Sequence, residues 1–257
     1  MRISQIISGV MALMMSVMLS FSSWAADQTV LITGSNRGIG FEFVKQYTDK
    51  GWNVIATARN PDGADDLYAW AAEHANVTVE KLDLLDHVGI DALAAKYDGQ
   101  AIDVLLNNAG LMRGPDKGQM VGMIDYDEFI RFYRINAMGP LKVAEAFAPH
   151  VMASETKIMA ALTTSKRENG IPAPGFSLYK TSKAALDAIW YELHLRWRGN
   201  GVKSIVLMPG RVLTHGEPPQ PNTVPIEDSI AGMIETLDNA TMEQSGHTYN
   251  WDGALIE

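Results

Sequence analysis

The sequence predicts a single doubly wound α/β domain, with a parallel sheet of about seven strands covered by helices on both faces. Three observations predict it. Short apolar runs alternate with longer helical stretches from residue 28 onward, at a spacing that suits right-handed β-α-β crossovers. Several of the short runs are apolar throughout, as in strands buried on both faces. A glycine-rich turn directly follows the first run.

The elements follow in order along the chain. The runs predicted as strands are 29–33, 53–57, 77–82, 102–106, 157–162, 202–207 and 247–251. A helix is expected from Ile39 to Lys50, because Gly51 supplies a stop signal. The clearest later helices are 126–148 and 178–198. No internal repeat or linker interrupts the pattern, so residues 26–257 are expected to form one domain.

Composition excludes several function classes. The 257 residues carry a formal net charge of −9, which makes nucleic-acid binding unfavourable. There is no cysteine, which rules out disulfides, thiolate metal sites and a cysteine nucleophile. The six histidines have no metal-ligand spacing, so no metal site is expected.

The first 25 residues have the layout of a secretory signal peptide. Arg2 is the only charge before Asp27, Val10–Leu19 is an apolar run, and small residues precede a possible cleavage after Ala25. The expected location is therefore exported, periplasmic or extracytoplasmic. Two alternatives remain: an uncleaved inner-membrane anchor, which would be the only membrane contact, and a cytoplasmic protein with a misassigned start.

The glycine-rich turn between the first strand and its helix predicts a phosphate-binding Rossmann turn. Glycines at this place permit a tight turn, close approach to a pyrophosphate and close packing of the helix on the strand. The free N–H groups at the start of that helix would face the anion. The turn residues expected to contact a dinucleotide are Gly34, Ser35, Asn36, Arg37, Gly38, Ile39 and Gly40.

The end of the second strand predicts which dinucleotide is bound. A site selective for NAD usually places an acidic residue there, to bond the ribose 2′-hydroxyl. Here the position carries Arg59, and Arg37 lies within the turn itself. Two guanidinium groups at one pocket suit the 2′-phosphate of NADP(H), which is the expected cofactor.

A tyrosine and a lysine one helical turn apart form the candidate proton-transfer pair. Tyr179 and Lys183 share a helix face, so both can act on one ligand. An unaided phenol titrates near pH 10, and an adjacent ammonium would stabilise its charged form. A tyrosine four residues before a lysine is common on protein surfaces. The pair indicates catalysis only together with the glycine turn and the other motifs of the chain.

Short motifs follow one another along the chain: the glycine turn 33–40, Asp83-Leu84, the segment 107–110, Asn136, the pair Tyr179 and Lys183, and the segment 209–214. Together they resemble the motifs of the short-chain dehydrogenase/reductase family, and most of all those of its C-factor and small carbonyl-reductase members. The resemblance implies that Tyr179 exchanges the substrate proton, that Lys183 assists it and binds ribose, and that Asn136 supports a water relay. Beyond the glycine turn and Arg59, it implies cofactor contacts from Asp83, Leu84, Asn107, Ala109, Gly110, Tyr179, Lys183, Pro209, Gly210, Val212 and Thr214.

The carbonyl-binding hydroxyl departs from the family pattern. The family usually places a serine thirteen residues before the tyrosine, where this chain has Lys166. Ser165 lies one residue further back and is the expected catalytic serine, because loops tolerate one extra residue. Thr164 is the alternative, since its hydroxyl can make the same hydrogen bond.

The sequence thus predicts an NADP-dependent oxidoreductase acting on the carbonyl or alcohol of a small organic substrate. A non-catalytic nucleotide-binding regulator is the alternative, and an isomerase or dehydratase on the same fold is a third. The irregular segments 111–124 and 211–225 follow strands and are expected to shape a rather open substrate site. The helices 126–148 and 178–198 could pair in a homo-oligomer. The substrate and the reaction direction stay undetermined.

Overall fold

The computed structural model describes residues 28–114, 118–164, 175–214 and 222–256. The expected signal peptide and Ser165 lie outside these residues. The strands are β1 (Thr29–Ile32), β2 (Asn53–Ala58), β3 (Val77–Lys81), β4 (Val104–Asn107), β5 (Ile158–Leu162), β6 (Lys203–Met208), β7 (Arg211–Val212), β8 (Thr223–Val224), β9 (Thr248–Asn250) and β10 (Leu255–Ile256). The α-helices are α2 (Gly38–Asp49), α3 (Asp65–Glu73), α4 (His87–Lys96), α5 (Tyr126–Tyr133), α6 (Gly139–Ala153), α7 (Ser177–Trp197) and α8 (Ile226–Asp238).

The main sheet has the strand order β10-β9-β6-β5-β4-β1-β2-β3. Its neighbours pair in parallel, except that β10 runs antiparallel to β9. The predicted parallel α/β sheet is therefore confirmed, with an eighth strand of two residues added at one edge. The short β7 and β8 form a separate parallel ribbon.

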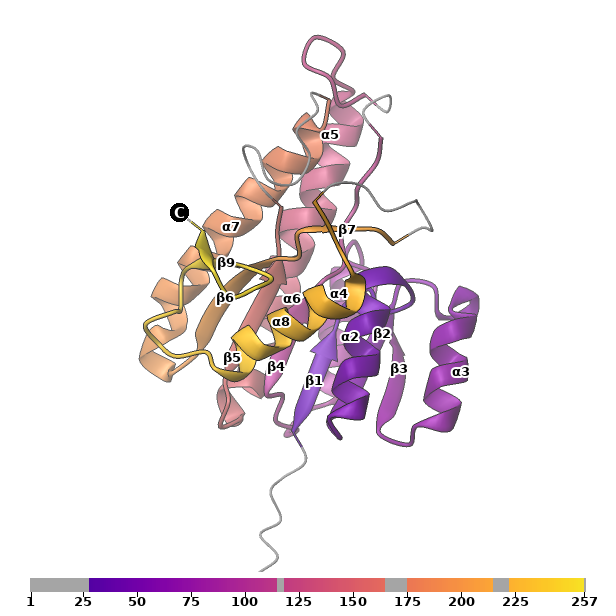
Figure 1. The fold of residues 1–257 in the computed structure, drawn as a ribbon, viewed down its shortest axis with the longest axis vertical. Coiled ribbons are helices and arrows are strands. Elements are labelled where there is room, and N and C mark those ends of the chain that lie inside the picture. Colours follow the sequence, from indigo (N-terminus) through magenta and orange to yellow (C-terminus); the bar gives the residue numbers. More distant parts are fainter. Residues whose placement is uncertain (1–27, 115–117, 165–174, 215–221, 257) are drawn as a thin grey trace, which may run out of the picture.

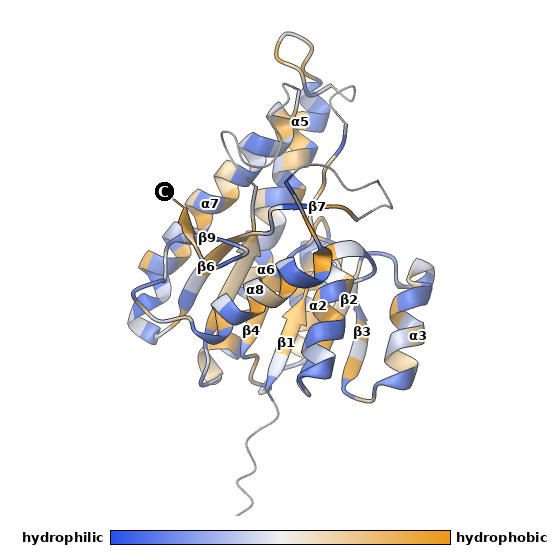
Figure 2. Ribbon diagram, in the orientation of Figure 1, coloured by the Kyte–Doolittle hydropathy of each residue, from blue (hydrophilic) through white to orange (hydrophobic). Residues whose placement is uncertain are grey.

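Helices cover both faces of the sheet (Figure 1), and each face has its own apolar core. Alternation along β1 shows the division, because Val30 and Ile32 join one core whereas Leu31 joins the other. The first core is completed by α2, α3 and α8, and the second by α4, α6 and α7. The strands form the apolar centre of the molecule in Figure 2. This two-sided burial explains why the strand sequences are continuously apolar.

The helix predicted over 126–148 is interrupted in its middle. It begins as α5, passes through a π-helical turn at Arg134–Met138, and continues as α6. The π turn contains Asn136, whose side chain is fully buried. Single π turns within α-helices often occur at functional sites. This widened turn places the Asn136 amide next to the loop that follows β4.

The sheet order also locates the expected ligand crevice. β1 lies between β2 and β4, and the chain leaves β1 toward the first core but leaves β4 toward the second. Loops that diverge in this way open a crevice at the carboxyl ends of the strands. Across the described ranges, every helix is too short or too polar to cross a bilayer.

Candidate active site

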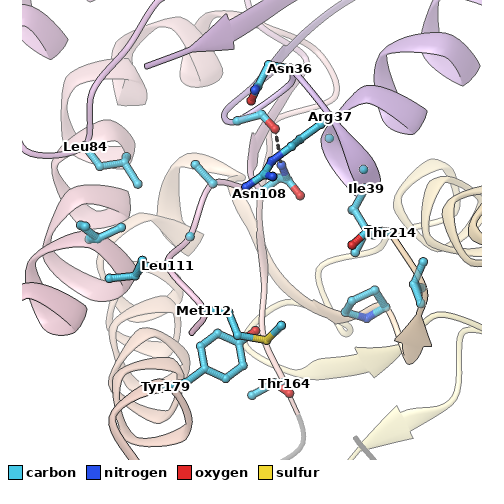
Figure 3. Close-up of a pocket in the computed structure, with 18 of the residues that line it drawn as sticks. Asn36, Arg37, Ile39, Leu84, Asn108, Leu111, Met112, Thr164, Tyr179 and Thr214 are labelled. Atoms are coloured by element: carbon cyan, nitrogen blue, oxygen red, sulfur yellow. Dashed lines mark hydrogen bonds between the residues drawn. The ribbon is translucent and has the colours of Figure 1, made fainter. Parts of the chain in front are cut away.

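A large pocket lies where the loops after β1 and β4 diverge. Its volume is about 1280 Å³, and its walls come from the carboxyl ends of the central strands and the start of α7. Figure 3 shows Asn36 and Arg37 at one end of the pocket and Tyr179, Thr164 and Met112 at the other. The predicted phosphate-binding turn and the predicted proton donor thus open into one cavity.

The glycine turn is formed by backbone that approaches other backbone very closely. Gly34 has a φ of +71°, and a Cβ there would lie 2.9 Å from the Cα of Ala109. A Cβ on Gly40 would lie 2.1 Å from the Gly34 carbonyl oxygen. Both contacts are impossible for a residue with a side chain. These two glycines therefore bring α2 and the β4 loop together at the turn.

Thr33 and Asn108 fasten this turn to the loop after β4. The Thr33 hydroxyl accepts from the backbone N–H groups of Asn108 at 3.1 Å and Ala109 at 3.0 Å. The Asn108 amide donates to the carbonyl oxygens of Thr33 at 2.8 Å and Gly34 at 2.9 Å. Four hydrogen bonds thus fix the relative position of two loops that continue to opposite faces of the sheet.

The turn end of the pocket suits an anionic group. Helix α2 begins here with no side-chain cap and no acidic residue in its first turn. Its first N–H groups and its positive dipole end are therefore available to an anion. Arg37 and Arg59 are exposed and both line the pocket. The arrangement provides contacts for a pyrophosphate and, beside it, for a second phosphate.

Tyr179 supplies the phenol at the opposite end of the pocket. It lies in the first turn of α7, and its hydroxyl is hydrogen-bonded to the side chain of Thr164, which follows β5. Burial raises the pKa of Tyr179 to about 12, and the Thr164 hydrogen bond opposes part of that rise by stabilising the phenolate. The sequence predicted that Lys183 would lower the pKa of Tyr179; in the structure the pKa is raised, and the opposing contribution comes from Thr164.

Lys183 lies one turn further along α7 and is buried. Its ammonium donates to the carbonyl oxygen of Leu162 at 2.7 Å. Burial lowers the pKa of Lys183 to about 8, while Asp187 acts in the opposite direction. A Cβ on Gly110 would lie 3.4 Å from the lysine nitrogen, so the ammonium lies directly behind the pocket wall.

Asn136 holds the backbone of the pocket wall. Its side-chain oxygen accepts from the Leu111 N–H at 2.6 Å, and its amide donates to the Leu111 carbonyl at 2.9 Å. The same amide donates to the Ser182 hydroxyl at 2.9 Å, which joins the wall to α7. Asn136 therefore contacts the protein's own main chain on one side and the proton-transfer helix on the other.

The structure brings most of the expected site residues to one pocket. Those that line it are Gly34, Asn36, Arg37, Gly38, Ile39, Gly40, Arg59, Asp83, Leu84, Ala109, Gly110, Tyr179, Pro209, Gly210, Val212 and Thr214. Lys183 and Asn136 lie behind the wall. Within the described chain, Ser35 and Asn107 are buried and are not part of the lining. Ser35 instead donates to the Ile32 carbonyl at 2.9 Å.

Thr164, which the sequence offered as the alternative to Ser165, is the hydroxyl that meets Tyr179 in the described structure. Of the two asparagines after β4, Asn108 lines the pocket and Asn107 does not, because successive residues at a strand end face opposite sides. Several other lining residues were not expected from the sequence. An apolar group also lines it: Leu111, Met112, Ile135, Phe176, Met208 and Leu213. Their only sequence signal is their place in or near irregular segments after strands.

Comparison with known proteins defines the class to which this site belongs. The family model for short chain dehydrogenases matches residues 28–223. The 1-hydroxy-2-glutathionyl-2-methyl-3-butene dehydrogenase of Rhodococcus sp. (strain AD45) is 33% identical over 236 residues, covering 89% of this chain and 99% of the relative. The chain therefore belongs to the short-chain dehydrogenase/reductase family.

Two further similarities agree with the expected branch of the family. The C-signal protein of Myxococcus xanthus is 31% identical over 156 residues, covering 60% of this chain and 92% of that protein. The crystal structure of NADPH-bound carbonyl reductase from chicken fatty liver superposes with a TM-score of 0.81 at 26% identity. That match covers 89% of this chain and 93% of the chicken chain.

Gly40→Ala tests the close approach in the glycine turn. The added methyl group collides with the Gly34 carbonyl, so we expect the free energy of unfolding to fall by about 1–3 kcal/mol. Gly199→Ala is the matched control, because no atom lies within 4 Å of its added Cβ. Urea unfolding of both variants measures the difference. Equal midpoints for Gly40→Ala and the parent protein would contradict the geometry.

Proposed function

We propose that this protein is an NADP-dependent carbonyl reductase in which Tyr179 is the general acid, and the general base in the reverse direction. The observation that carries the proposal is the placement of Tyr179 and Thr164 at one end of a pocket whose other end has a glycine turn and two arginines. The similarity to an NADPH-bound carbonyl reductase supports it. One end of the pocket can therefore hold the phosphates of the cofactor, while the other end carries the hydroxyls of Tyr179 and Thr164.

The cofactor residues fit a dinucleotide phosphate. The N-terminus of α2 would hold the pyrophosphate, and Arg37 with Arg59 would hold the ribose 2′-phosphate. No carboxylate occupies the end of β2, where selectivity for NAD usually requires one. When bound, the nicotinamide supplies the hydride for carbonyl reduction.

Proton transfer is the task of this chain's own side chains. The Tyr179 phenol donates its proton to the substrate oxygen, and the Thr164 hydroxyl hydrogen-bonds the same region and stabilises negative charge there. The buried Lys183 ammonium stabilises the phenolate that remains. Asn136 bonds the backbone of Leu111 and the Ser182 hydroxyl on α7, so the pocket wall and the helix that carries Tyr179 keep a fixed relative position.

The apolar part of the pocket lining indicates the kind of substrate. Met112, Phe176 and Leu213 are among the apolar side chains that line this pocket. Methionine and phenylalanine make favourable contacts with aromatic and alkyl groups. We therefore propose an apolar or aromatic aldehyde or ketone as the substrate class, with the carbonyl directed to Tyr179.

Removing either pocket arginine tests cofactor choice. We expect Arg37→Ala and Arg59→Ala each to raise the Kd for NADPH about tenfold, because each loses one charge-assisted contact with the 2′-phosphate. The Kd for NADH should change little. Arg196→Ala, an exposed arginine near the end of α7, is the control. Fluorescence titration measures both constants, and tighter binding of NADH than NADPH by the parent protein would contradict the assignment.

The pH dependence of alcohol oxidation tests the Tyr179 and Thr164 pair. Oxidation requires the phenolate, so the rate rises with pH toward the Tyr179 pKa. Thr164→Val removes the hydrogen bond that lowers that pKa, so the rising limb should move to higher pH and kcat should fall about 100-fold.

Two controls accompany the Thr164 variant. Thr164→Ser keeps a hydroxyl and should retain the parent profile, whereas Tyr179→Phe should lose activity about 1,000-fold or more while still binding NADPH. A Tyr179→Phe enzyme with parent activity would exclude Tyr179 as the acid.

We also propose that the chain is exported. The basis is the N-terminal sequence pattern together with the family match, which begins at residue 28 and so leaves the leader-like segment before the domain. Cell fractionation with intact-mass analysis tests this, and the expected product lacks residues 1–25 and lies outside the cytoplasm. A full-length chain in the cytoplasm would contradict export.

A further inference from the structure

Gln119 is a fully buried polar residue in the segment between β4 and α5. Its side chain does not line the pocket within the described structure, yet it meets the first turn of α7, where Tyr179 lies. A buried amide needs partners for both its oxygen and its nitrogen. The identity of those partners shows what Gln119 does.

The partners on one side are N–H groups at the start of α7. Helix α7 begins after Phe176, which provides no side-chain cap. The first N–H groups of a helix have no partner within the helix, and a capping side chain usually satisfies the N–H at the second or third position. Here the side-chain oxygen of Gln119 accepts from the Tyr179 N–H at 3.1 Å, and the main-chain carbonyl oxygen of Gln119 accepts from the Ser177 N–H at 3.3 Å. A residue from a distant loop therefore caps α7.

The partners on the other side belong to the loop after β4. The Gln119 amide donates to the carbonyl oxygens of Arg113 at 2.6 Å and Gly114 at 3.1 Å. That loop is joined to α5, because the Gly118 carbonyl accepts from the Asp125 N–H at 3.0 Å. The Arg113 guanidinium also lies 3.2 Å from the Glu128 carboxylate on α5. The amide of Gln119 thus connects α7 to a second helix.

These contacts act on the phenol through its backbone. Tyr179 is the third residue of α7, and its N–H is the group that Gln119 holds. The α5 end of the molecule, the loop before it and the start of α7 project beyond the sheet in Figure 1. In this projecting region the first turn of α7 depends on Gln119 for two of its N–H contacts.

We propose that Gln119 is the positioning residue of this active site, holding Tyr179 in place against Thr164 by capping α7 from the loop after β4. The proposal rests on the proposed role of Tyr179 in proton transfer. It deepens that role by naming the group that sets the phenol's position. The same loop carries Met112, which lines the pocket next to Arg113. The Gln119 side chain therefore holds both Tyr179 and the part of the pocket wall that includes Met112.

The test replaces the amide with a group of similar shape and no hydrogen bonds. In Gln119→Met we expect kcat to fall about 10- to 100-fold, as for a misplaced catalytic group, while the Kd for NADPH stays within twofold. The rising limb of alcohol oxidation should move to higher pH, since a displaced phenol loses the Thr164 hydrogen bond that lowers its pKa. A merely structural role would leave that limb in place.

Asp86→Ala is the matched control. Asp86 caps α4 by accepting from the Gly89 N–H at 2.9 Å, so this variant also loses one helix cap. It should lose thermal stability comparably, yet keep the parent kcat and pH profile. Should Gln119→Met not fold, Gln119→Asn carries the test, because its amide is one carbon shorter and cannot keep both sets of contacts. The same changes in kcat and pH profile are expected for it.

Hydrogen exchange separates this proposal from the proposed function. The amide of Tyr179, which the Gln119 side chain holds, should exchange at least about tenfold faster in the folded Gln119 variants than in the parent or Asp86→Ala proteins. If the parent enzyme shows no NADPH-dependent turnover but this exchange difference appears, the function fails and the cap stands. Unchanged exchange, or a folded Gln119 variant with parent kcat and pH profile, overturns the positioning role.

Discussion

The hydrogen bonds between Thr33 and the Asn108–Ala109 backbone are the constraint on which this site depends. They hold together two loops that the sheet topology would otherwise separate, since the chain continues from them to opposite faces. The glycine turn can then meet Ala109 at van der Waals distance, and Gly110 can lie over the buried Lys183 ammonium. A crevice with the glycine turn at one end and Tyr179 at the other follows from that one junction.

Around this junction, the buried polar side chains act mainly on the main chain. Lys183 bonds the Leu162 carbonyl, Asn136 bonds both backbone groups of Leu111, and Gln119 bonds the first turn of α7. Each uses its buried hydrogen-bonding groups to fix part of the pocket wall or the helix beside it. Tyr179 and Thr164 are then the hydroxyls that meet at the end of the pocket where we propose proton transfer. Rigid support of this kind is what a general acid needs, because proton transfer depends on sub-ångström placement.

The sequence predicted the sheet, the glycine turn and Tyr179 because each has a local pattern. The π turn containing Asn136 was not predicted, since one widened turn leaves the apolar periodicity of 126–148 intact. The choice between Asn107 and Asn108 depends on the exact end of β4, which periodicity fixes poorly. The cap of α7 by Gln119 joins residues 60 positions apart, and no local signal marks such a pair.

In the proposed function, this chain transfers hydride from NADPH to a carbonyl carbon while Tyr179 supplies the proton. The most direct measurement uses NADPH deuterated at both C4 positions, with an aromatic aldehyde or ketone as substrate and the product analysed by NMR. We expect an alcohol with one deuterium on its carbinol carbon, formed by the parent enzyme and not by Tyr179→Phe. A protein that binds NADPH but forms no deuterated alcohol from any of these carbonyl compounds would contradict it.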